Sequence, residues 1–221
     1  MRYIKRICIA LSVIVFVSCI GIEMETKFNS DGSGEMMIRI LVSQELLEMG
    51  EEGTAGVALP LSEEEIEEAY ANVDGVVVQE VTQEETEKDR IITAKISFQD
   101  FNEFAQLEEF PGEGASIREV DGNTEFTMTV GQAPEDGEGS AEQEEGAENA
   151  ETLIDSMDES MMAMVQAFME GYFVEYRIVA PKKIISHTDG ELGPDGKSVT
   201  LKIPMGEFFM IQEPYDLTVV W

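Results

Sequence analysis

Cys19 is the residue whose type and sequence context most clearly predict a chemical modification. A basic start containing Arg2, Lys5 and Arg6 precedes an apolar run, 7–17, and the small residue Ser18 stands directly before the cysteine. A basic segment followed by about 7–15 apolar residues is the pattern of a secretory leader. We therefore expect that residues 1–18 are removed as a signal peptide and that lipid is attached to the sulfur of Cys19.

Two other fates of this segment stay open. An uncleaved spanning helix needs about 20 apolar residues, whereas this run is stopped by Glu23 and already contains Gly21. Cleavage without a lipid is the second alternative, because Phe16 stands where bacterial lipoprotein signals usually carry leucine.

Cys8 leaves with the leader, so Cys19 has no partner for a disulfide in the mature chain. The pattern predicts an extracytoplasmic protein of the bacterial cell envelope that is anchored to the membrane by its N-terminal lipid.

His187 is the single histidine, which excludes a zinc site built from histidine and cysteine. A nucleophile–histidine pair would need Ser186, but neighbours on a strand point to opposite faces. We expect no catalytic residue at this position.

Two acidic segments are candidates for calcium binding. Residues 29–34 echo the start of an EF-hand loop, but the twelfth position is Ile40 instead of glutamate. Asp189, Glu191 and Asp195 form a second set without a fixed spacing. We expect neither a metal nor a cofactor.

A methionine-rich segment begins at Thr152, and Asp155 completes a helix-start pattern there. Its apolar residues fall at helical spacing and predict one apolar face. Three alternatives are open for that face: packing on the core, a groove for an apolar ligand, and copper(I) binding by thioethers. The residues of the candidate groove are Met157, Met161, Met164, Val165 and Phe168.

The formal net charge is −32, from 46 acidic and 14 basic residues. Such a surface repels phosphates, so the charge argues against binding of nucleic acid or of anionic lipid headgroups. Residues 131–151 hold many acids and no large apolar residue, which predicts a disordered acidic loop. Nothing singles out a pair of carboxylates for glycoside hydrolysis.

The remaining chain alternates short strand patterns with a few helix-start signals. It predicts one α+β domain over 19–221, interrupted at 131–151, with a mainly antiparallel sheet built from hairpins and packed with a few short helices. Helix starts are expected at Ser62 and Asp100, and a helical turn at 204–210. Strands are expected at 22–28, 35–42, 75–81, 90–98, 117–120, 124–130, 172–179, 182–186, 198–203 and 215–221.

Three parts of the chain carry a resemblance to a known family. The strand that leaves Cys19 with the turn at 29–34, and the later segments 176–187 and 195–205, are similar to the LppM-type bacterial lipoproteins. The resemblance implies an extracytoplasmic α+β domain attached to a membrane, and it supplies no catalytic residues.

These patterns together predict a noncatalytic envelope or surface protein that binds a protein partner or an apolar ligand. A purely structural envelope lipoprotein and a carboxylate-based hydrolase are the alternatives.

Overall fold

A computed structural model describes residues 20–44, 47, 62–70, 73–107, 114–131, 171–208, 210–211 and 213–221. Cys19, the acidic loop beyond Gly131 and the methionine-rich segment lie outside these residues, and so do all five residues of the candidate groove. Within the described residues, no helix is long and apolar enough to cross a bilayer.

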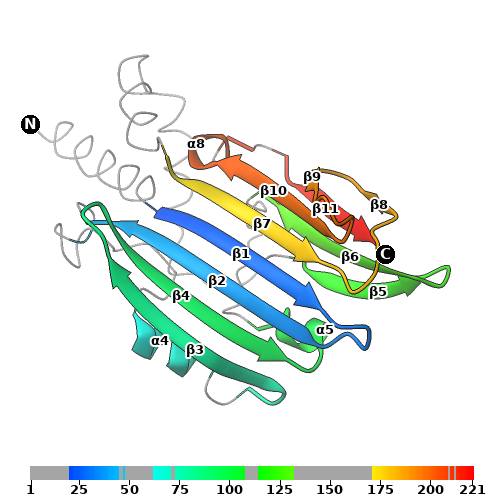
Figure 1. Cartoon of the computed structure of the whole chain (residues 1–221), viewed down its shortest axis with the longest axis horizontal. Coiled ribbons are helices and arrows are strands. Elements are labelled where there is room, and N and C mark those ends of the chain that lie inside the picture. Colours follow the sequence, from blue (N-terminus) through cyan, green and yellow to red (C-terminus); the bar gives the residue numbers. More distant parts are fainter. Residues whose placement is uncertain are drawn as a thin grey trace, which may run out of the picture.

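Two sheets form the body of the protein (Figure 1). Sheet A has seven strands in the order β3-β4-β2-β1-β7-β10-β9, and sheet B has four in the order β5-β6-β11-β8. The strands of sheet A are β1 (Ile20–Phe28), β2 (Gly34–Ser43), β3 (Val76–Glu85), β4 (Asp89–Phe98), β7 (Phe173–Val179), β9 (Glu191–Leu192) and β10 (Ser198–Pro204). Those of sheet B are β5 (Ser116–Val120), β6 (Asn123–Val130), β8 (Ser186–His187) and β11 (Tyr215–Val220).

Sheet A has an apolar inner face and a polar outer face because its strands alternate in sequence. Along β1, Met24 and Phe28 are buried, whereas Glu23 and Glu25 point to the other side. The pairing of Met24 with Ile38 and of Glu23 with Arg39 carries this alternation into the neighbouring strand. A slip of one residue would expose the whole inner row, so the pattern fixes the register.

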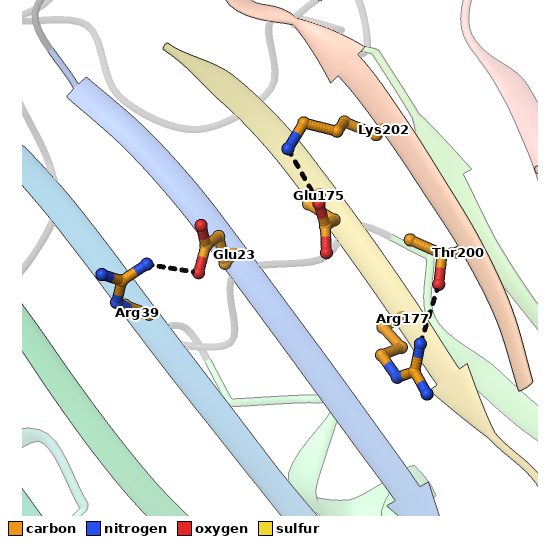
Figure 2. Close-up of polar contacts among 6 residues, drawn as sticks. All are labelled: Glu23, Arg39, Glu175, Arg177, Thr200 and Lys202. Carbon is orange, nitrogen blue, oxygen red and sulfur yellow. Dashed lines mark hydrogen bonds and ion pairs between the residues drawn. The ribbon is translucent and has the colours of Figure 1, made fainter. Parts of the chain in front are cut away.

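The outer face of sheet A carries cross-strand pairs of opposite charge (Figure 2). Arg39 donates to Glu23 at 2.8 Å, and Lys202 lies 3.2 Å from Glu175. Such exposed pairs contribute about 0–1 kcal/mol each to the free energy of unfolding. The pairs therefore help to set the register of the strands but add little to stability.

The described residues include three short helices, α4 (Glu63–Tyr70), α5 (Phe101–Phe104) and α8 (Met205–Phe208). Helix α4 packs against β3, α5 contacts β5, and α8 contacts β7 and β10. The predicted caps are confirmed. Ser62 Oγ accepts from the amide of Glu65 at 3.2 Å, and Asp100 Oδ1 accepts from the amides of Asn102 and Glu103. Capping satisfies the first amides of a helix and fixes where it begins.

A cluster of aromatic side chains joins the two sheets. Phe28 of β1 packs against Phe126 of β6 at 5.6 Å and against Trp221 at 5.3 Å between ring centroids. Phe101 of α5 completes the cluster at 5.0 Å from Phe28. These four rings are at most 4% exposed, so the core is continuous from one sheet to the other.

We name the two ends of sheet A by the course of β1. The start pole holds Ile20, the beginnings of β4 and β7 and the end of β10, whereas the turn pole holds the turn at 29–33. At about 3.3 Å per residue, the nine residues of β1 separate the poles by about 30 Å.

The structure confirms the mainly antiparallel pairing and corrects the predicted fold in two respects, the number of sheets and one strand. The pairing is largely antiparallel, but β1 and β7 pair in parallel, and the strands form two sheets instead of one. The predicted strand 182–186 is wrong. Ile184 donates to Gly196 and Ile185 to Val220, so this segment crosses between the sheets, and β8 is confined to two residues.

Candidate functional site

The turn pole carries an open cleft of about 320 Å³. One wall is the turn at 29–32 between β1 and β2, and another is the start of α5 with its residues Asp100 and Asn102. Strand β5 supplies residues 117–119, and Pro181 and Lys182 follow β7. Segments that lie far apart in the sequence therefore meet here, and the buried ring of Trp221 forms part of the lining.

Each of two aspartates at the cleft has one oxygen engaged by the backbone. Asp31 Oδ1 accepts from the amide of Ser33 at 3.2 Å and from its hydroxyl at 2.7 Å. The hydroxyl bond and then the amide bond lower the pKa of Asp31, which keeps this carboxylate ionised. Asp100 Oδ1 is held by the α5 amides. The backbone thus fixes both carboxylates at the rim.

The cleft is lined by more acidic than basic side chains. Arg118 is paired with Glu125 across β5 and β6, so its charge is already offset. Lys182 and Glu119 are exposed and have no ion pair within the described residues. The cleft can therefore bind a polar group, and its excess of carboxylates favours hydroxyls or cations over anions.

Asn102 joins α5 to β5 below the cleft. Its Oδ1 accepts from the amide of Ile117 at 2.8 Å, and its Nδ2 donates to the carbonyl of the same residue at 2.9 Å. The side chain thus pairs with both backbone groups of one partly buried residue, as another strand would.

Asn102→Ala is expected to lower the free energy of unfolding by about 2 kcal/mol, because a partly buried amide and carbonyl lose their partner. Urea unfolding followed by circular dichroism measures this loss. The matched control is Asn29→Ala, which removes one exposed bond to Ser33 and should cost under about 1 kcal/mol. Equal effects of the two substitutions would show that Asn102 does not hold β5 in place.

His187 takes no part in a catalytic arrangement within the described residues. Its Nδ1 lies 3.0 Å from the carbonyl oxygen of Asp189, and no hydrogen bond joins it to Ser186. Asp189 Oδ2 accepts instead from the hydroxyl of Tyr215 at 3.0 Å. Burial, followed by the interaction with Asp189, raises the pKa of Tyr215 to about 12, so its hydroxyl stays protonated at neutral pH.

Neither acidic segment considered for calcium forms a metal cluster. Among the residues that the structure describes, no three His, Cys, Asp or Glu side chains gather closely enough to hold an ion. Asp189 is engaged by Tyr215 and by the amide of Gly190, and Asp195 Oδ1 by the amide of Lys197. These carboxylates therefore bond to neighbouring residues in place of an ion.

The described part of the intersheet core offers little space for an apolar ligand. Its gap, lined by methionines and by Phe126, Tyr176, Ile178 and Thr26, measures about 10 Å³. That volume holds about one water molecule at most. Burial raises the pKa of Tyr176 to about 12, as expected for a phenol enclosed by apolar side chains.

No pattern in the sequence predicts the turn-pole cleft. Its polar residues belong to turns, a cap and an edge strand, and each of these types is common on any surface. The turn at 29–34 was considered for calcium, but its proximity to α5 and β5 depends on the packing of sheet B against sheet A.

Comparison with known proteins gives one structural likeness. No family model matches the chain, and no curated protein matches it. The chain is similar to the NMR structure of the folded domain of the LppM protein of Mycobacterium tuberculosis, with 12% sequence identity and a TM-score of 0.46. The likeness covers 91% of this chain and 88% of that one. At this sequence identity and TM-score, neither residue roles nor ligands can be transferred from that protein to this chain. Membership of the LppM-type family stays a prediction.

Proposed function

We propose that the protein is a noncatalytic lipoprotein of the bacterial cell envelope, held to a membrane by lipid on Cys19, which presents the turn-pole cleft to a polar partner. The observation that supports the anchor is the start of β1 at Ile20. Lipidation at Cys19 therefore places the lipid directly beside the first strand, with no linker between them.

The start of β1 also suits cleavage before Cys19. Ile20 is 3% exposed, pairs with Val42 and belongs to the core. Cleavage a few residues later would remove core side chains, and each large one lost would cost about 2–5 kcal/mol. A mature chain that begins at Cys19 retains the whole strand.

The position of the cleft supports a binding function. It lies about 30 Å from the start of β1, at the opposite end of sheet A. A scaffold without a partner has no need of an open polar cleft, so this feature favours binding over a purely structural role.

The noncatalytic part of the proposal rests on the placement of the polar groups. The buried polar residues among those described are Thr26, Ser43 and Ser198, and none of them is a carboxylic acid. A hydrolase that uses two carboxylates needs one acid kept protonated by its surroundings. The described residues offer no pair of that kind.

The chain supplies a matched pair of cysteines for the test. Cys19→Ser should move the protein from the detergent phase to the aqueous phase in a phase-separation assay and abolish incorporation of a labelled fatty acid. Cys8→Ser should change neither result, because that residue leaves with the leader. A wild-type protein that stays in the aqueous phase without label would overturn the proposal.

A further inference from the structure

We infer that the start pole is a membrane-contact surface, on which Tyr172, Phe173 and Met210 lie in the interfacial region of the bilayer. This inference rests on the proposed lipid at Cys19 and adds an orientation and a set of contacts to it. A surface covered by a second copy or a soluble partner in place of the bilayer would leave the labels described below unquenched.

Figure 1 shows the start of β7 beside the start of β1, and α8 at the end of β10. The amide of Met210 donates to the carbonyl of Glu207 in α8 at 3.0 Å. Phe173 directly precedes Val174, which pairs with Ile22. On its other side, Phe173 pairs with Pro204, the last residue of β10. The amide of Met205 in α8 donates to the carbonyl of Tyr172 at 3.0 Å, which holds the helix at this pole.

The residue types suit the boundary between headgroups and acyl chains. Met210 is a large apolar side chain that is 61% exposed. The ring of Tyr172 passes over Gly21, where an added Cβ would lie 3.5 Å from its Cδ1, and its hydroxyl donates to Asp89. Aromatic side chains with one polar end are enriched at membrane interfaces.

Lys202 adds a second amphipathic contact. Its Nζ lies 3.1 Å from the centroid of the Phe173 ring and 3.2 Å from Glu175, which Figure 2 shows beside it. A lysine of this kind keeps its stem on apolar surface while its ammonium group reaches polar surroundings. The ring and the lysine together form an apolar surface with a charged edge.

The charges at this pole favour neutral lipid as the occupant. Asp89, Glu207 and Glu213 outnumber the nearby cations Lys88 and Lys202. Anionic headgroups would be repelled, whereas zwitterionic headgroups meet no net penalty. Because no residue separates Cys19 from β1, a bilayer that holds the lipid also lies within a few ångströms of this pole.

The test uses single cysteines, because the proposed acylation of Cys19 leaves no other thiol in the mature chain. Met210→Cys and Phe173→Cys carry a bimane label at the start pole, and Ser30→Cys carries it in the exposed turn at the other end. The lipoprotein is reconstituted in phosphatidylcholine vesicles that contain a nitroxide on the acyl chain near the headgroup.

The labels at 210 and 173 should lose at least about half of their fluorescence, because interfacial side chains lie about 5–10 Å into the boundary region, and the label at 30 should keep its intensity. Equal quenching at all three positions, or none at 210 and 173 while the protein floats with the vesicles, would overturn the inference alone. Protein that fails to float would overturn the lipid anchor and the inference together.

Discussion

Phe101→Ala is expected to lower the free energy of unfolding by about 4 kcal/mol. Phe101 is 1% exposed, and its ring packs 5.5 Å from Phe98 and 5.6 Å from Phe126. It therefore contacts sheet A and sheet B at once. Truncation leaves a cavity where the two sheets meet, and neither sheet can collapse into it without moving the other.

Denaturant unfolding of the purified protein measures this loss. The control is Ile185→Ala, which truncates a side chain that is 64% exposed and should change stability by less than about 0.5 kcal/mol. A loss below about 1 kcal/mol for Phe101→Ala would mean that the aromatic cluster does not hold the sheets together.

Gly34→Ala is expected to lower the free energy of unfolding by about 3 kcal/mol. An added Cβ at Gly34 would lie 2.3 Å from the carbonyl oxygen of Lys27 and 2.6 Å from Cζ of Phe98. The first contact is with backbone, which cannot rotate away. The methyl group would therefore push β2 away from β1 at the turn that also lines the cleft.

Gly21→Ala is the matched control, since Gly21 also lies where β1 pairs with β2. Its added Cβ meets Tyr172 and Leu41 at 3.5–3.6 Å, which is ordinary van der Waals contact. Alanine in a strand also loses less entropy on folding than glycine, so stability should stay equal or rise by about 0.5 kcal/mol. Thermal melts that rank the two variants in the opposite order would contradict the described register.

Local patterns predicted the hairpins and the helix starts. Asp121 and Gly122 have φ of 53° and 80°, the left-handed conformations that a tight hairpin turn requires, and β5 and β6 pair around them. The caps at Ser62 and Asp100 depend on residues two or three positions away. These elements were predictable because their partners are close in sequence.

Long-range pairing was not predictable in the same way. The parallel pairing of β1 with β7 joins Met24 to Tyr176, and nothing local to either strand specifies it. The same packing brings the turn at 29–32 to α5 and β5, so the cleft could not be found before the sheets were placed. The strand predicted over 182–186 was wrong for a related reason, because one of its backbone bonds goes to the turn before β10 and another goes to β11.

The mass of the N-terminal peptide from the mature protein, purified from bacterial membranes, tests the central claim most directly. The account predicts a peptide that begins at Cys19 and carries a diacylglyceryl group on the sulfur. A peptide that retains residues of the leader, or one that begins at Cys19 or later without a lipid, would contradict it.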